Sequence, residues 1–145
     1  MVNIIEKRFL PKQIVGPDEK ERLSKALSEW LSHEPGILFV YIHGSFVTGV
    51  AFRDIDVGLY TRDKKDFSYE SDLSFELSKA IGHEVDVKVI NDAPVAFKMA
   101  VISGGRLLFS RNDDVRTDFI EDVGRRYREY AHFRNIYMEA VGAER

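Results

Sequence analysis

The chain has 145 residues, the length of one domain, and its formal net charge at pH 7 is −3. Hydrophobic residues make up 44% and charged residues 31% of the sequence, which excludes a disordered or fibrous protein. The negative net charge excludes a strongly basic nucleic-acid binder. Cysteine is absent, so disulfides, thiolate metal sites and cysteine nucleophiles are excluded. No apolar run approaches the roughly 20 residues of a membrane span, and no signal-peptide core is visible. We therefore expect a single cytoplasmic domain over residues 1–145.

The first half of the chain predicts one helix followed by two strands. Apolar residues recur at helical spacing over 17–31, and Asp18 followed by Glu21 has the spacing of a capping box at the start of this helix. A β-branched and aromatic run at 37–42 is typical of a buried strand, and a second strand is expected at 54–60.

The second half predicts alternating helices and strands. The expected elements are a helix at 71–81, a strand at 85–90, a helix at 92–102, a strand at 106–109 and a long amphipathic helix from 113 onward. Gly82 is expected to end the first of these helices, while Asp92 and Pro94 are expected to cap and begin the second. Gly124 is a position where the last helix can kink or divide. This order predicts an α+β fold, in which a small mixed β-sheet is flanked by helices and a long helix ends the chain.

A glycine and a serine follow the strand at 37–42. Gly44 lets the backbone turn sharply and approach a ligand closely. A helix that starts after it would direct backbone N–H groups and the Ser45 hydroxyl toward an anion, most naturally a phosphate. A Gly-Ser pair alone is usually only a turn, so its meaning depends on the residues that follow.

Carboxylates interrupt two of the predicted strands. Because strand side chains alternate, Asp54 and Asp56 project from one face while Ile55 and Val57 enter the core. Adjacent carboxylates repel unless they share a cation, and hard oxygen ligands suit Mg²⁺ or Mn²⁺. If the strand that carries Asp86 lies beside this pair, three carboxylates can hold the two metal ions of a phosphoryl-transfer site. Taken singly, each aspartate also fits a solvated strand face or an edge-strand charge.

The combination of these motifs resembles the nucleotidyltransferase motif of the DNA polymerase beta superfamily, and more closely the minimal nucleotidyltransferases. Its parts are Gly44-Ser45 after a hydrophobic strand, a spacer that contains Gly49, and the pair Asp54 and Asp56. An Asp-bearing strand, a short helix, a glycine and another strand follow in the same order, so the resemblance covers most of the chain. It implies that Gly44 and Ser45 hold the β- and γ-phosphates of a nucleoside triphosphate and that the aspartates ligate metal ions.

The resemblance also implies a reaction. The enzyme would use Mg²⁺ or Mn²⁺ to transfer a nucleoside monophosphate, such as AMP from ATP, to a hydroxyl group with release of pyrophosphate. Asp86 would ligate the catalytic metal and take the proton of the attacking hydroxyl. A frequent role of the family is the antitoxin that adds AMP to a tyrosine of a HEPN-domain toxin.

An alternative is a domain that has kept the fold but binds its partner stoichiometrically. Only eight residues separate Ser45 from Asp54, and Thr48 stands where the family commonly has Arg. Arg53 stands where a Ser often precedes the aspartates, and it could contact a phosphate from there. Lys88 lies on the same strand face as Asp86, where it either reaches a phosphate or remains a solvated lysine.

Other polar and aromatic residues favour structural roles. No second histidine lies at ligand spacing from His43, so this residue is expected to be structural. The basic cluster at 125–128 lies among acidic residues and is expected to be a solvated helix face rather than an RNA site. The aromatic residues of the last helix are expected in the core, or at an interface with a partner or a second subunit. Neither a membrane nor a nucleic acid is expected as a partner, and a homo-oligomer is left open.

Overall fold

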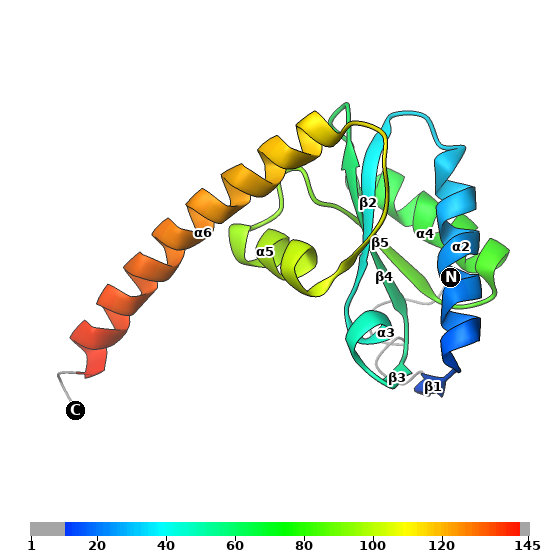
Figure 1. Cartoon of the computed structure of the whole chain (residues 1–145), viewed down its shortest axis with the longest axis horizontal. Helices are drawn as coiled ribbons and strands as arrows, with labels where there is room; N and C mark the ends of the chain where they lie inside the picture. Colours follow the sequence, from blue (N-terminus) through cyan, green and yellow to red (C-terminus); the bar gives the residue numbers. More distant parts are fainter. Residues whose placement is uncertain (1–10, 143–145) are drawn as a thin grey trace.

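The computed structural model describes residues 11–142 (Figure 1). The elements in chain order are β1 (Gln13–Ile14), α2 (Pro17–Ser32), β2 (Ile37–His43), α3 (Ser45–Thr48), β3 (Ala51–Phe52), β4 (Ile55–Thr61), α4 (Phe67–Ile81), β5 (Val85–Val89), α5 (Val95–Gly104), β6 (Arg106–Ser110) and α6 (Asp113–Gly142). Four strands form a sheet in the order β5-β4-β2-β6, and β1 pairs with β3 separately. Since β4 is parallel to β5 but antiparallel to β2, this sheet is mixed, and the predicted α+β class is confirmed.

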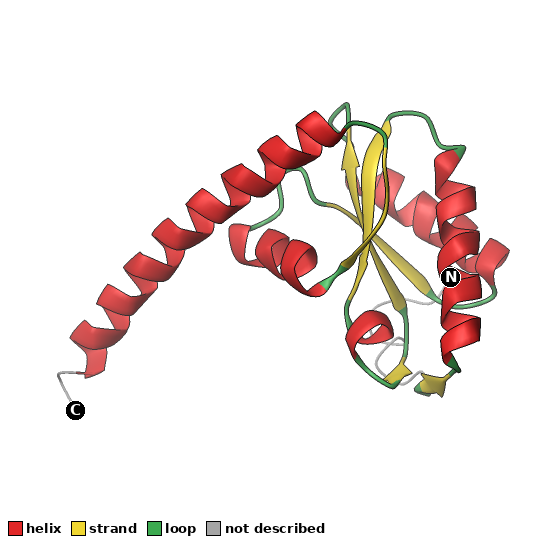
Figure 2. Ribbon diagram, viewed as in Figure 1, coloured by secondary structure: helices red, strands yellow, loops and turns green. Residues whose placement is uncertain are grey.

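Helices cover both faces of the four-stranded sheet (Figure 2). On one face, leucines of α2 and α4 such as Leu27 and Leu77 pack against Ile55 and Val57 of β4. On the other face, α5 and α6 lie over β2 and cover a second cluster of buried residues. Its fully or almost fully buried members are Phe39, Tyr41, Ile90, Val101, Phe119 and Val123. Period-two alternation along β2 and β4 therefore decides which side chains lie on the α2/α4 face and which on the α5/α6 face.

The helix α2 begins at Pro17 as predicted, but its cap differs from the prediction. Gly16 is the N-cap residue, and no side chain caps the helix, so the predicted capping box of Asp18 and Glu21 is wrong. Pro17 begins the helix because its fixed φ and missing N–H suit the first helical position, which places Asp18 inside the first turn. Glu21 instead forms an ion pair with Arg106 at 3.2 Å.

The boundaries of α4 and α5 also depend on their caps. α4 begins at Phe67, four residues before the predicted start, because the side chain of Asp66 accepts a hydrogen bond from the Tyr69 N–H at 3.1 Å. Gly82 ends α4 in the left-handed conformation, as predicted. The assignment of Asp92 as the cap of α5 is wrong, because Pro94 occupies that position without a side-chain cap, and the helix begins at Val95 rather than at Pro94 as predicted.

The helix α6 is continuous over its 30 residues, and Gly124 does not divide it. Its first half packs against the sheet through the buried residues Phe119 and Val123. Its second half extends beyond the sheet (Figure 1), so the expectation that its aromatic residues lie in the core is wrong there. The exposed apolar side chains of this half are Tyr130, Phe133, Ile136, Tyr137, Met138 and Val141.

The basic cluster of α6 forms the expected ion pairs on a solvated helix face. Asp122 accepts contacts from Arg125 at 2.5 Å and from Arg126 at 2.9 Å, and both arginine side chains are exposed. Within residues 11–142, no helix combines the length and the apolarity that crossing a membrane requires.

Candidate metal and nucleotide site

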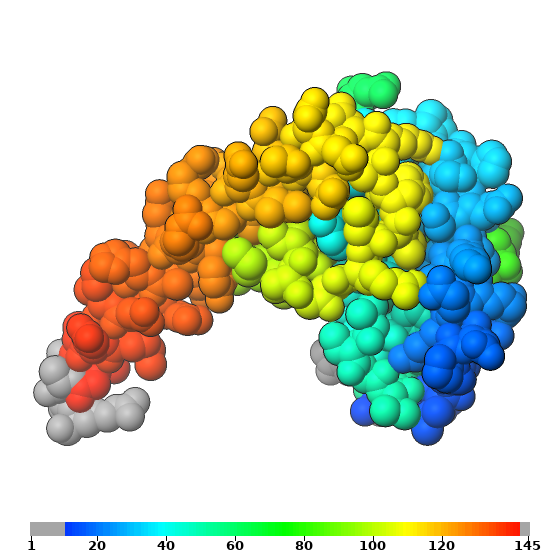
Figure 3. All heavy atoms as spheres, viewed as in Figure 1, coloured from blue at the N-terminus to red at the C-terminus, as the bar shows by residue number. Residues whose placement is uncertain are grey.

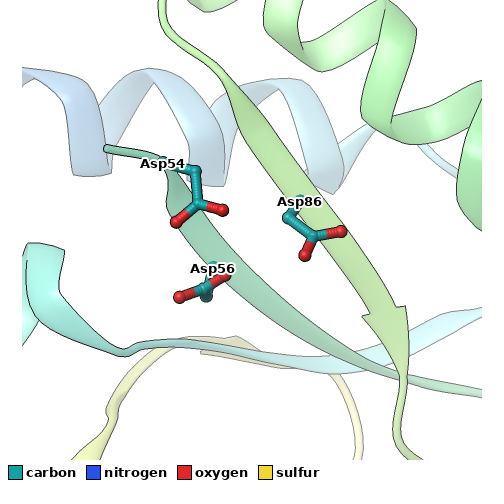
Figure 4. A group of neighbouring side chains, drawn as sticks. All are labelled: Asp54, Asp56 and Asp86. Atoms are coloured by element: carbon teal, nitrogen blue, oxygen red, sulfur yellow. The ribbon is translucent and has the colours of Figure 1, made fainter. Parts of the chain in front are cut away.

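Three carboxylates meet at the beginning of β4 and β5. The parallel register sets Asp56 directly beside Asp86, and Asp54 comes just before β4. Each of the three is half-buried and offers one oxygen, and these oxygens all lie within 4.8 Å of one another (Figure 4). Their strand neighbours Ile55 and Val57 are fully buried on the opposite face, as the alternation predicts. The strand that carries Asp86 thus lies beside the aspartate pair, as expected.

This arrangement fits a divalent cation. Three like charges at this spacing repel one another, and a shared cation relieves that repulsion. The donors are carboxylate oxygens, which Mg²⁺ and Mn²⁺ prefer over softer ligands. The donor set and its spacing therefore suit hard divalent ions bridged to phosphate oxygens.

Gly44 directly follows β2 and packs against this cluster. Its φ of 77° and ψ of −161° lie in a region that is essentially restricted to glycine. A Cβ atom at this position would overlap Oδ2 of Asp56, so the backbone of Gly44 lies directly against the carboxylate. The predicted helix start follows, since α3 begins at Ser45, whose side chain is exposed. The turn therefore places Ser45 next to the carboxylates.

The short helix α3 is anchored from two sides. The buried ring of Phe46 packs edge-on against Phe52, with 4.9 Å between ring centroids. The Gly49 N–H donates to the Ser45 carbonyl at 2.8 Å, and the Gly49 carbonyl accepts a hydrogen bond from Lys20 Nζ at 2.8 Å. Sequence reasoning does not predict a role for Lys20, because this residue lies on α2, 29 positions before Gly49, and no motif spacing indicates the contact. It is a positioning residue for the loop that contains Gly49.

The two predicted cationic residues lie in different places. Lys88 is on the carboxylate face, with its Nζ 3.8 Å from Asp86 Oδ1 and its side chain 46% exposed. Arg53 is exposed and lines a hollow of about 390 Å³ with His83 and Ser78, where α4 ends. The structure thus brings Lys88 to the carboxylates and places Arg53 at the border of this hollow.

His43, the last residue of β2, pairs with Asp56 in the antiparallel ladder. Its imidazole packs edge-on against Phe97, and its Nε2 is buried without a hydrogen-bond partner among the described residues. Burial lowers the pKa of His43, and the negative charges of Asp86 and Asp54 oppose this effect only in part. The ring is therefore neutral at pH 7 and lies beside Asp56 on the same face of the sheet.

Comparisons with known proteins agree with this geometry. The family model "Polymerase beta, Nucleotidyltransferase" matches residues 25–114. The fold is similar to a chain in the structure of a tri-AMPylated Shewanella oneidensis HEPN toxin in complex with MNT antitoxin. That match has a TM-score of 0.69 and 19% identity, and covers 84% of this chain and 98% of the other.

A chain in a toxin–antitoxin structure with AMP-PNP is similar with a TM-score of 0.70 and 21% identity, and 81% of this chain and 97% of the other are covered. A chain in the toxin–antitoxin MntA-HepT structure gives a TM-score of 0.68 at 18% identity, with 83% and 97% covered. No curated protein matches the sequence. The family model matches more than half of this chain, and the three carboxylates lie within the matched residues. The chain therefore belongs to the polymerase beta nucleotidyltransferase family.

Proposed function

We propose that this protein is a metal-dependent nucleotidyltransferase that transfers AMP from ATP to a tyrosine hydroxyl of a HEPN-domain toxin in the cytoplasm, and thereby acts as its antitoxin. The observation that carries the proposal is the cluster of Asp54, Asp56 and Asp86, with its oxygens within 4.8 Å of one another, beside the Gly44 turn. The acceptor is proposed from the similar structures, which are described as complexes with an AMPylated HEPN toxin and with AMP-PNP.

The three aspartates would hold the divalent ions, Mg²⁺ or Mn²⁺. Bound there, these ions would supply positive charge to the triphosphate and to the pyrophosphate that leaves. Lys88 adds a fixed positive charge on the same face, 3.8 Å from Asp86, and is proposed to contact a phosphate when nucleotide is bound. Arg53 is proposed to reach a phosphate from the loop that precedes Asp54.

The turn after β2 is proposed to bind the β- and γ-phosphates. The glycine-only conformation of Gly44 brings the backbone close to the carboxylates, where a phosphate bridged to the same ions would lie. The exposed Ser45 hydroxyl can donate a hydrogen bond to a phosphate oxygen. Gly49 is proposed to close the other end of this loop, which Lys20 fixes at 2.8 Å.

Asp86 is proposed as the general base. The acceptor hydroxyl oxygen forms a bond to the α-phosphorus, the bond between that phosphorus and the bridging oxygen breaks, and pyrophosphate leaves in line. The hydroxyl proton passes to the Asp86 carboxylate, which is half-buried and therefore still reachable from solvent.

Calorimetric titration with ATP, with and without Mg²⁺, tests the nucleotide site. We expect magnesium-dependent binding by the wild type that the Asp54→Asn/Asp56→Asn variant loses. The matched control is Asp72→Asn, which removes an exposed carboxylate on α4, across the sheet, and should bind like the wild type. Equal magnesium-dependent binding by all three proteins would refute the assignment of the carboxylates.

Transfer itself is tested with ATP labelled at the α-phosphate. The wild type is incubated with lysate of its source cells, and the labelled protein is identified by mass spectrometry, where we expect AMP on a tyrosine and no label with Asp56→Asn. A toxin that is neutralised stoichiometrically, without nucleotide and without label, would instead establish the alternative of a binding module that has kept only the fold.

A further inference from the structure

The second half of α6 carries an apolar surface that no described residue covers. We define the distal stripe as Tyr130, Phe133, Tyr137 and Val141, which are between 36% and 72% exposed. Tyr130, Tyr137 and Val141 follow the fully buried Val123 by 7, 14 and 18 positions, which is helical spacing on one face. The stripe therefore continues the same face of α6 that packs on the sheet.

The distal stripe and the carboxylates lie on the same side of the sheet. Ile55 and Val57 pack toward α2 and α4, so Asp56, which alternates with them, projects toward the side of α5 and α6. Figure 3 shows a hollow between the second half of α6 and the rest of the molecule, with α5 above it and α3 on the facing rim. Gly44, at the start of α3, lies against Asp56, so the carboxylates border this rim.

The distal stripe supplies a large part of the area that specific binding needs. At roughly 200 Å² for each large apolar residue, the exposed fractions correspond to about 400 Å². That is about half of the about 800 Å² that one partner contributes to a specific interface. Its aromatic composition is also typical of interface centres.

The charge around the distal stripe indicates the character of the partner. Arg125 and Arg126 pair with Asp122, so Arg134 is the arginine within residues 130–142, the segment that carries the stripe. Arg134 stacks on the Tyr130 ring at the border of the stripe, with 5.7 Å to the centroid. A complementary partner surface is therefore apolar with acidic residues at its edge.

We propose that the distal stripe is the docking surface for the acceptor protein of the transfer reaction, an inference that rests on the proposed function. A protein bound to the distal stripe fills the hollow between the second half of α6 and α3. It thereby brings a side-chain hydroxyl to the rim where the carboxylates lie. A second copy of the chain seated there would occupy the space that the acceptor has to enter.

The test compares two double variants of the full chain, each of which introduces two glutamates into α6. Phe133→Glu/Tyr137→Glu places carboxylates in the distal stripe, and His132→Glu/Asn135→Glu places them on the opposite face of α6, where both residues are exposed. The binding partner is the purified protein that the α-phosphate labelling identifies. We expect the stripe variant to bind magnesium–ATP like the wild type and to bind the acceptor at least about 100-fold more weakly, with slower labelling. The opposite-face variant should match the wild type in all three measurements.

Unchanged acceptor binding and labelling by the stripe variant would overturn the docking surface while the proposed function stands. Light scattering that shows a wild-type dimer and a monomeric stripe variant, with labelling unchanged, would overturn it in favour of a second copy. A wild type that neither binds magnesium–ATP nor labels any protein would refute the proposed function instead, so the two failures are distinguishable.

Discussion

Replacing Gly44 with alanine tests whether the turn after β2 supports the carboxylate cluster. Its φ of 77° and ψ of −161° are a glycine-only combination, and forcing another residue into that region costs about 1–3 kcal/mol. The added methyl group would also overlap Asp56 Oδ2, so the carboxylate has to move. We therefore expect Gly44→Ala to lower the free energy of unfolding by about 2–3 kcal/mol, the upper part of that range, and to weaken magnesium-dependent ATP binding.

Gly82→Ala is the matched control. Gly82 also has a positive φ, 82°, but no atom lies within 4 Å of a Cβ placed there. Only the backbone term of about 1 kcal/mol applies, and nucleotide binding should not change. In urea unfolding with a slope of about 2 kcal/mol per molar, the midpoint should fall by about 1–1.5 M for Gly44→Ala and by about 0.5 M for the control.

A double-mutant cycle separates the two contributions. Removing the Asp56 side chain in Asp56→Ala eliminates the overlap, so Gly44→Ala should cost less in that background than in the wild type. Additive losses in the cycle, or a Gly44→Ala protein that is no less stable than Gly82→Ala and binds magnesium–ATP normally, would refute the close approach of backbone and carboxylate.

Three further predictions concern the packing of α6, the contact between the ends of β4 and β5, and the dependence of stability on pH. Phe119→Ala should lower the free energy of unfolding by about 3–5 kcal/mol, because this residue is only 8% exposed. Phe133→Ala on the same helix should change it by less than about 0.5 kcal/mol, because Phe133 is 72% exposed. Equal losses for the two variants in urea unfolding would contradict this. Asn91→Ala should cost about 1–3 kcal/mol, because the Asn91 side chain accepts from the N–H of buried Thr61 at 3.0 Å and donates to its carbonyl at 2.7 Å; unchanged thermal unfolding would argue against this clamp. Burial lowers the pKa of His43 below the unfolded value of 6.5, so the unfolded chain binds the proton first as the pH falls, and stability is full above pH 6.5 and declines below it. Urea unfolding in the absence of divalent metal, from about pH 7.5 to about pH 5, should show a shallower decline for His43→Asn, and identical slopes would exclude this contribution.

The carboxylate cluster could be predicted because it depends on local rules. Alternation along a strand places Asp54 and Asp56 on one face whatever the rest of the chain does. The motif order then indicated that Asp86 belongs to the same centre, and the parallel register of β4 and β5 confirms that placement. The contact of Lys20 with Gly49 could not be predicted, because it depends on how α2 packs against the sheet and no local pattern encodes that.

Local patterns that compete with one another were less reliable. Asp18 and Glu21 have capping-box spacing, yet Pro17 occupies the first helical position, so Asp18 lies inside the first turn and cannot be the cap. Asp66 caps α4, so this helix begins four residues before the predicted start at residue 71, because one side-chain hydrogen bond to the Tyr69 N–H suffices to start the helix there.

The sequence by itself determined the order of the long helices and of the four strands of the main sheet, the faces of these strands and the chemical character of the site, because these depend on side-chain periodicity and residue type along a short stretch of chain. The short pair β1 and β3 was not predicted. Only the tertiary structure decided which apolar surfaces are covered. The helical spacing of α6 runs without a break from Val123 to Tyr137, but the sheet ends between them, so the first is buried and the second is 59% exposed. Periodicity specifies that a helix has an apolar face, whereas burial requires another element opposite that face, and only the packing of the whole chain supplies it.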